Sequence, residues 1–313
     1  MEKLKILIPE RMVGLRMDVA LSEMLPNVSR SKITSSINSS DTLSNKKKFK
    51  PKDKSKGNEV VTIDQELKEK ISWEPEEIPL KIIFEDHDII VIDKPAGLVT
   101  HPGAGNYTGT LANALLNYDI SLSKIDRAGI VHRLDKNTSG LMVVAKNPKS
   151  QKHLVEQLQT HSVHREYSAI VYGHMISGGT VNEPIGRHPK ERVKQSVRLN
   201  GKSAITHYRV VDRFENHTHI KAILETGRTH QIRVHLSHIG YPLVGDKLYG
   251  GRVRFARKAG NKIKKALRVF QRQALHSKKL TLKHPATGNL MTWKIELPED
   301  MMLLLEALKS FDS

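Results

Sequence analysis

A series of short β-rich segments, each bounded by Gly, Asn, Asp or Pro, constrains the fold of this chain more than any other feature of its sequence. The segments begin at residue 80 and read LKIIFEDHDIIVID, LMVVAK, YSAIVYG, SAITHYRVV and HIKAILE. Helical patterns are fewer, at residues 110–117, 149–159, 229–239 and 299–308. Because strands outnumber helices and do not alternate with them regularly, the pattern disfavours a doubly wound nucleotide-binding fold. We predict a mixed α+β domain.

A small basic module precedes this region. Apolar residues repeat at helical spacing before Pro26, and Ser29 is placed to cap a second helical run that carries Arg30 and Lys32 in its first turn. Seven lysines follow between residues 46 and 56. That run is typical of a solvated basic loop leading into a short strand, and solubility alone would also account for it.

A change of composition separates the module from the rest of the chain. Residues 72–79 read SWEPEEIP, an acidic stretch with two prolines that is typical of an exposed linker. We therefore predict two domains, a lysine-rich module at residues 1–75 and a larger domain at residues 76–313. A length of 313 residues agrees with this division, since domains average about 150 residues.

The charge balance favours a polyanionic partner. The chain has 51 Lys and Arg against 33 Asp and Glu, a formal net charge of +18. Residues 251–280 contain eleven Lys or Arg and no acid, with apolar residues at helical spacing that would hold one face down. Contact with RNA or DNA explains such one-sided charge better than a basic face without a partner.

Several classes of protein are excluded by what the sequence lacks. It has no cysteine, which rules out disulfide scaffolds, thiolate zinc sites and iron–sulfur clusters and fits a reducing compartment. No window approaches 18 consecutive apolar residues, and the first residues do not resemble a secretory signal. We expect a cytoplasmic protein that does not contact a membrane.

Familiar catalytic and metal motifs fail in detail. The glycines of HPGAGNYTG are spaced one residue too widely for a dinucleotide loop, and Ser139 lacks the glycine two positions earlier that a nucleophile elbow requires. His230, His235 and His238 lie close together, but their spacing matches no zinc motif and no carboxylate is near until Asp246. We expect these histidines to form local hydrogen bonds or to touch RNA phosphates.

The segment GIVHRLDKNTSGLMVVAKN, residues 129–147, remains as the candidate for chemistry. Asp135 is flanked there by Arg133 and Lys136 on a short turn between apolar runs. The cations would keep the carboxylate ionised and available as a nucleophile or base. A surface salt bridge would give the same sequence, so these residues alone leave both interpretations open.

Three separated motifs show that the sequence resembles the RluA-like pseudouridine synthases. They are R-x-G-I-V-H-R-L-D-K-x-T-S-G-L at residues 127–141, G-R-T-H-Q-I-R-V-H-L at 227–236 and R-Q-A-L-H at 272–276. The opening DIIVIDKPAGLVTHPGAG, residues 88–105, is also similar. The resemblance covers nearly everything from residue 80 onward, and it implies a mixed, mainly antiparallel sheet of pseudouridine synthase type.

The resemblance also implies roles for individual residues. Asp135 matches the catalytic aspartate, Arg233 the arginine that pairs with it, and Tyr167 the tyrosine that stacks on the uracil. The carboxylate would attack the sugar, add to the base or remove a sugar proton, and the residues do not decide among these routes. Without the resemblance, Tyr167 would be interpreted as a core tyrosine on a strand.

Substrate-binding roles follow in the same way for Arg133, His132 and Leu236. Arg133 matches the arginine that fills the gap left by the extruded base, a step that costs a few kcal/mol. Leu236 matches a hydrophobic pocket residue, although core packing accounts for it equally well. The module at residues 1–75 resembles the ribosomal-protein S-four-like RNA-binding domain, in which SRSK, with Arg30 and Lys32, would contact RNA.

Large-subunit ribosomal RNA, free or in an assembling subunit, is the partner that the resemblance implies, with the target in the stem-loop facing the decoding centre. The isomerisation needs no cofactor and no metal, and we expect a monomer. Two alternatives stay in view: a non-catalytic RNA-binding or ribosome-assembly factor that keeps the fold, and a metal-dependent nuclease. The nuclease ranks last because no carboxylate cluster has the spacing to hold two metals.

Overall fold

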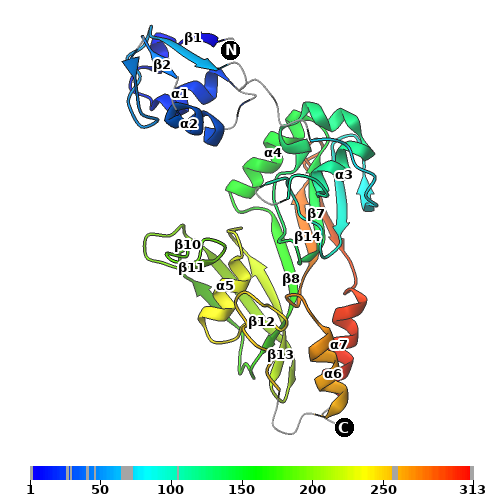
Figure 1. Ribbon diagram of the computed structural model, residues 1–313. Helices are drawn as coiled ribbons and strands as arrows, with labels where there is room; N and C mark the ends of the chain where they lie inside the picture. The colour runs from blue at the N-terminus through cyan, green and yellow to red at the C-terminus, as the bar shows by residue number, and fades with distance from the viewer. Residues whose placement is uncertain are drawn as a thin grey trace. The chain divides into compact units, whose positions relative to one another are not determined.

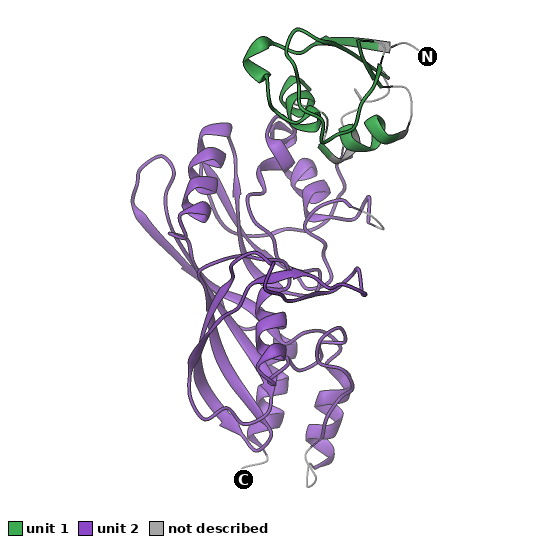
Figure 2. Ribbon diagram, turned by 90° about the vertical axis from the view of Figure 1, so that its left-hand side faces the viewer, with its two compact units in different colours: residues 1–72 green, residues 73–313 purple. Residues whose placement is uncertain are grey.

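The chain forms two compact units, which Figure 2 colours separately. The computed structural model describes residues 3–25, 28, 30–39, 42–45, 47–64, 73–103, 106–255 and 260–310. The units are residues 1–72 and 73–313, so the division lies three residues before the boundary that the sequence predicts. Among the described residues, no helix is both long and apolar enough to cross a bilayer.

Unit 1 packs two helices against a small sheet. Its elements are β1 (Lys3–Leu7), η1 (Glu10–Met12), α1 (Met17–Met24), α2 (Arg30–Ser39), β2 (Leu43–Ser44), β3 (Lys47–Lys48) and β4 (Val60–Asp64). The strands lie in the order β1-β4-β2-β3. The two predicted helices and the strand after the lysine-rich loop are confirmed. Apolar side chains from both helices, including Leu21 and Ile33, meet Val61 and Ile63 of β4 in one core.

Unit 2 is built on one large mixed sheet (Figure 1). Its elements are β5 (Lys81–Glu85), β6 (Ile89–Lys94), α3 (Leu111–Tyr118), η3 (Ile120–Lys124), η4 (Asp126–Gly129), β7 (Ser139–Ala145), α4 (Pro148–Gln159), β8 (His164–Tyr172), β9 (Gly179–Asn182), β10 (Ile185–Arg187), β11 (Gln195–Val197), β12 (Ile205–Phe214), β13 (His217–Leu224), α5 (Gln231–His238), α6 (Asn261–Val269), β14 (Leu275–Lys283), β15 (Leu290–Lys294) and α7 (Glu299–Lys309).

The strand order of the large sheet is β5-β6-β7-β14-β8-β13-β12-β9, with β15 also paired to β14. Only β7 and β14 run parallel among these pairs, and the others are antiparallel. The prediction of an α+β fold with a mainly antiparallel sheet is therefore confirmed. Strand β8 lies between β14 and β13, and so it connects the two halves of the sheet.

The core of unit 2 lies on both faces of the sheet. Along β6, Ile90 and Ile92 enter one apolar cluster while Ile89 and Val91 enter another, so this strand is buried on both sides. That burial explains why its sequence is a continuous apolar run rather than an alternating one. The first cluster also contains Tyr167, which places this side chain at the boundary between core and site.

Residues 73–79 belong to unit 2, which corrects their interpretation as a linker, although four of the seven side chains are exposed as expected. The ring of Trp73 lies 5.6 Å from that of His101, and the side-chain amide of Asn113 donates to the Glu74 carbonyl at 2.8 Å. The backbone amide of Gly109 donates to the Glu76 carboxylate at 3.0 Å. The composition of this segment is that of a linker, but Trp73 and its neighbours hold the segment to unit 2.

Strands β7 and β14 approach closely at Gly140, so adding one methyl group there should strongly lower the stability of the fold. Gly140 has a φ of +114°, and a Cβ there would lie 2.3 Å from the Ser277 carbonyl oxygen. We expect Gly140→Ala to lower the free energy of unfolding by more than about 3 kcal/mol, measured by urea denaturation. Gly240→Ala is the matched control, because Gly240 also has a positive φ, +88°, but faces open space. Equal losses in the two variants would contradict this account.

Candidate active site

Asp135 lies in the loop between η4 and β7, and a buried lysine holds this loop in place. The Nζ of Lys94, a side chain with no exposed surface, donates to the carbonyls of Pro95, Leu98 and Lys136 at 2.7, 2.9 and 3.2 Å. Burial lowers the pKa of Lys94 to about 7, while the charge of Asp135 opposes that shift. Because Lys136 follows Asp135 directly, this contact fixes the backbone beside the carboxylate.

Arg233 of α5 joins Asp135 to a second carboxylate. Its Nη1 donates to Oδ2 of Asp135 at 3.0 Å, and its Nε and Nη2 donate to the two oxygens of Asp246 at 2.7 and 2.9 Å. Arg233 is 7% exposed and Asp246 is 2% exposed. Burial alone lowers the pKa of Arg233, but the bonds to Asp246 and the charge of Asp135 raise it above its ordinary value. The guanidinium therefore remains a cation with a fixed orientation.

Backbone amides fix Asp246 in turn. Oδ1 of Asp246 accepts from the amides of Leu248 and Tyr249 at 3.0 and 3.1 Å. The guanidinium of Arg233 also lies over the ring of Tyr249, 4.9 Å from its centre. Nothing in the sequence near Asp246 indicated this role, since its partner lies thirteen residues earlier on a helix.

His230 approaches the other oxygen of Asp135, with 4.0 Å between Nε2 and Oδ1. The hydroxyl of Tyr249 lies 2.8 Å from Nδ1 of His230, and its oxygen already accepts from the Gln195 amide at 2.9 Å. Tyr249 can therefore donate its proton to Nδ1, and in that tautomer the ring proton of His230 lies on Nε2, on the side of Asp135. Burial lowers the pKa of His230. From the sequence we expected this histidine to form a local hydrogen bond or to touch RNA phosphates, and its position beside Asp135 was missed.

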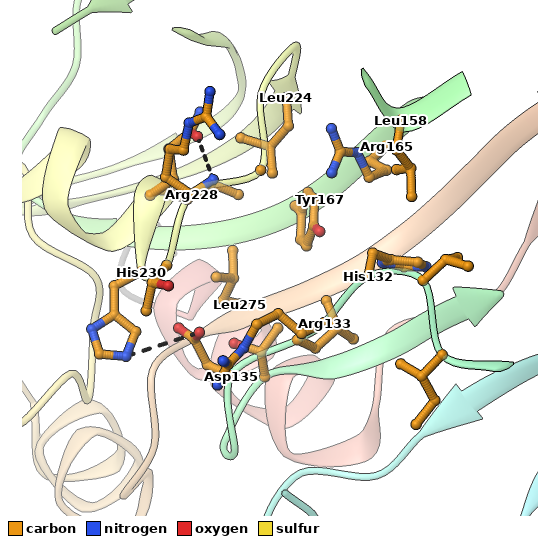
Figure 3. Close-up of a pocket in the computed structure, with 18 of the residues that line it drawn as sticks. His132, Arg133, Asp135, Leu158, Arg165, Tyr167, Leu224, Arg228, His230 and Leu275 are labelled. Carbon is orange, nitrogen blue, oxygen red and sulfur yellow. Dashed lines mark hydrogen bonds and ion pairs between the residues drawn. The ribbon is translucent and has the colours of Figure 1, made fainter. Parts of the chain in front are cut away.

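A cavity of about 550 Å³ within unit 2 opens beside these residues (Figure 3). Asp135 is the one carboxylate among its lining residues, and five arginines line it: Arg127, Arg133, Arg165, Arg228 and Arg233. Tyr167 also lines it and is 5% exposed, and burial raises the pKa of its phenol. The arrangement suits a polyanionic ligand from which one neutral group enters the cavity.

The remaining predicted site residues in unit 2 occupy different places. Arg133 is exposed and lines the cavity. His132 also lines it, but its Nε2 accepts from the Val143 amide at 3.1 Å, and burial lowers its pKa to about 3. Leu236 is fully buried in the core and is not among the residues that line the cavity. Core packing, the other interpretation of Leu236, therefore accounts for its position.

In unit 1, Arg30 begins α2 and pairs with Asp18, to which its Nη2 donates at 2.9 Å. Arg16 donates to the same carboxylate, so Asp18 holds two arginines whose side chains are half exposed. Lys32 lies on α2, but its side chain is outside the described residues. The structure thus places Arg30 on the surface of the module.

One group of side chains in the described residues has the spacing of a metal site, formed by Asp86, Asp88 and His284. Its atoms are already engaged. Nε2 of His284 donates to Asp86 at 2.8 Å, because Nδ1 accepts backbone amides. Asp88 accepts from Asn147 and from Ser150 at 3.0 and 2.7 Å. These bonds join the β5–β6 turn to its neighbours, so we interpret the group as structural.

The three clustered histidines, at the N-cap of α5 and within it, lie in different surroundings and do not form a metal site. His235 is fully buried, with Nδ1 2.9 Å from the Thr206 hydroxyl and Nε2 2.9 Å from the Glu183 carbonyl. His238 is exposed, and His230 faces Tyr249 and Asp135. They do not converge on one point, which agrees with the expectation of local hydrogen bonds.

Comparison with known proteins identifies the family. A family model of RNA pseudouridylate synthases matches residues 88–238. The ribosomal large subunit pseudouridine synthase D of Yersinia pestis is 52% identical over 98% of this chain and 95% of that protein. The protein of the same name from Escherichia coli K12 is 51% identical over 97% of this chain and 93% of that protein. This chain belongs to the RNA pseudouridylate synthase family.

A solved structure supports the fold assignment. Human RNA pseudouridylate synthase domain containing 4 superposes with a TM-score of 0.57 at 26% identity, covering 73% of this chain and 93% of that one. The resemblance inferred from the three sequence motifs is thus confirmed at the level of family and fold.

Because Arg233 binds both Asp135 and Asp246, removing the charge of Asp246 should disturb the position of Asp135. We expect Asp246→Asn to lower kcat for pseudouridine formation about 10- to 100-fold, since hydrogen bonds between charged groups are worth about 1.5–3 kcal/mol. Asp300→Asn is the control, because Asp300 accepts from Nε and Nη2 of Arg272 at 2.6 and 2.8 Å but is half exposed. Steady-state kinetics of both variants provide the measurement. A similar small effect in both would show that Asp246 does not support the site.

Proposed function

We propose that this protein isomerises uridine to pseudouridine in large-subunit ribosomal RNA and that Asp135 is its catalytic carboxylate. The observation that carries the proposal is the position of Asp135, the one acid among the residues that line a cationic cavity, fixed by Arg233 on one oxygen and faced by His230 on the other. The choice of substrate rests on the names of two relatives, which are about half identical to this chain over nearly its whole length.

The reaction is balanced without any added reagent. The bond from C1′ of the ribose to N1 of uracil breaks, a bond from C1′ to C5 forms, C5 loses its proton and N1 gains one. Each of the three routes open to an aspartate, attack on the sugar, addition to the base or removal of a sugar proton, uses an ionised and oriented carboxylate. The bond from Arg233 Nη1 to Oδ2 of Asp135 supplies the orientation.

Two further residues act on the target base in this proposal. Arg133 is exposed at the cavity two residues before Asp135, where its side chain can occupy the space that an extruded uridine leaves in the RNA. Tyr167 presents its ring to the cavity from β8 and stacks on the uracil. His132 holds the loop before Asp135 to β7 through the Val143 amide and shapes the pocket wall.

Basic surfaces in both units bind the RNA backbone in this proposal. Unit 1 corresponds to the S-four-like module expected at residues 1–75; its helix α2 carries Arg30 and Lys32, and exposed lysines lie on and after β3. In unit 2, α6 packs Ile263 and Leu267 into an apolar cluster and turns basic residues outward. Such contacts position the RNA without reading its sequence. The protein acts as a monomer in the cytoplasm, with free RNA or an assembling large subunit as substrate.

Release of tritium from uracil C5 tests the proposal, because isomerisation must free that hydrogen while binding or cleavage would not. With large-subunit RNA carrying tritium at C5, we expect Asp135→Asn to abolish release and to leave RNA affinity nearly unchanged. Asp126→Asn is the control, since Asp126 lies in η4 just before the same loop with an exposed side chain. Substantial turnover by Asp135→Asn would refute the assignment.

If the lysines of unit 1 bind RNA phosphates, replacing them should weaken the dependence of RNA affinity on salt concentration. Replacing Lys47, Lys48 and Lys50 together by Ala should make the slope of log affinity against log salt shallower by about 0.7–0.9 for each phosphate that these lysines neutralise. The side chains of all three lysines are exposed. The exposed Lys283, Lys294 and Lys309, replaced by Ala together, remove the same charge and serve as the control for a change in net charge alone. An unchanged slope in the triple variant would show that this module does not contact RNA.

A further inference from the structure

Arg165 is a buried cation in the cavity to which the proposed reaction assigns no role. It lies on β8 two residues before Tyr167, so both side chains point to the same face of the sheet. It is 6% exposed and lines the cavity with Tyr167 and Leu224. Figure 3 shows its guanidinium on the same wall of the pocket as the ring of Tyr167.

The guanidinium of Arg165 lacks a counter-charge. Its Nη2 donates to the Glu225 carbonyl at 3.3 Å, whereas its Nε is buried without a partner. Among the described residues, no carboxylate forms an ion pair with it, since Glu225 pairs with His207 and Glu166 pairs with Lys221. Burial lowers the pKa of Arg165, which shows how poorly the site solvates this charge.

The guanidinium of Arg165 lies close against Gly227. A Cβ at Gly227 would lie 2.6 Å from Nη1, so a larger residue there would displace the end of the Arg165 side chain. Keeping a buried cation unpaired costs free energy, and in folded proteins such groups are found where a ligand or a developing charge compensates them. The group that enters this cavity must therefore carry or acquire negative charge near Arg165.

The reaction supplies such a charge. When the C1′–N1 bond breaks, its electron pair stays on the uracil and spreads to the oxygens O2 and O4. Resting on the proposed function, we propose that Arg165 is a catalytic residue that donates a hydrogen bond to a uracil oxygen as this negative charge develops. Arg165 transfers no proton. The charge is discharged when C5 bonds to C1′, C5 loses its proton and N1 takes one up.

The position of Arg165 favours the base over a phosphate as its ligand. It is buried in the cavity wall, on the same strand face as the tyrosine that stacks on the uracil. By contrast, Arg133 is exposed and Arg228 is partly exposed, which suits contacts with the RNA backbone. A preformed donor in a site closed to water stabilises a developing anion more than the same donor would in solution.

A comparison of two leaving groups tests the proposal. We expect Arg165→Met to slow single-turnover conversion of uridine RNA about 10²- to 10³-fold, as measured for donors to developing anions. With 5-fluorouridine at the target position, the fluorine itself stabilises the uracil anion. The loss should then be at least about tenfold smaller, since less stabilisation is left for Arg165 to provide. Consumption of the target nucleotide, followed by mass spectrometry after digestion, measures both rates.

Two further variants separate catalysis from structure. Arg228→Met makes the same substitution in the same cavity, but the Nε of Arg228 already donates to the Ser203 carbonyl at 2.9 Å, so the ratio of the two rates should not change. Arg165→Lys keeps the charge without the planar fork and should restore part of the uridine rate. Thermal unfolding of each variant shows whether it is folded.

The results of these experiments distinguish a wrong role for Arg165 from a wrong function for the protein. Equal loss on both substrates by a folded Arg165→Met would assign Arg165 a structural role and overturn the proposal. A weaker affinity for RNA with an unchanged single-turnover rate would assign it to a phosphate and overturn it too. If the unaltered protein released no tritium from uridine RNA, the proposed function itself would fail, which is a separate result.

Discussion

Sharing of the Arg233 guanidinium between two carboxylates is the interaction on which the rest of the site depends. Two of its nitrogens are committed to Asp246, whose own oxygen is fixed by the amides of Leu248 and Tyr249, so the third points in one direction. That direction is toward Asp135. The orientation of the Asp135 carboxylate is thus set by backbone geometry in the loop after α5 and by the bond from Lys94 to the Lys136 carbonyl in the loop that carries Asp135. An arginine with a single flexible partner would hold the charge without fixing its direction.

The same arrangement explains how a strongly cationic cavity handles a neutral base. In the proposed function, phosphates of the RNA meet the more exposed arginines of the cavity, which supply affinity without selecting a sequence. Asp135 and Arg165 lie deeper, where burial reduces the screening of their charges, and the proposals place the reacting nucleotide beside them. On this account the exposed charges provide binding, and the buried charges provide chemistry.

Much of the fold and part of the site could be predicted from the sequence. The helix at 229–239 and the apolar run of β6 were predictable because periodicity and burial act locally, and three motifs marked Asp135, Arg233 and Tyr167. Asp246 and Lys94 were missed because their bonds to Arg233 and to Lys136 join residues 13 and 42 positions apart. Arg165 was missed because no local pattern signals an unpaired buried charge. The linker prediction was wrong for residues 73–79 because it rested on composition, whereas contacts of Trp73, Glu74 and Glu76 with residues distant in sequence dock the segment.

The central claim is that Asp246 acts on catalysis only through Arg233. A double-mutant cycle of Asp246→Asn and Arg233→Lys, measured as kcat/KM for tritium release, tests it most directly. If the claim holds, the double variant should be no slower than the slower of the two single variants, because each change releases the same constraint on Asp135. Multiplicative losses, with each substitution retaining its full effect in the presence of the other, would show that the two residues support the reaction independently and would contradict the account.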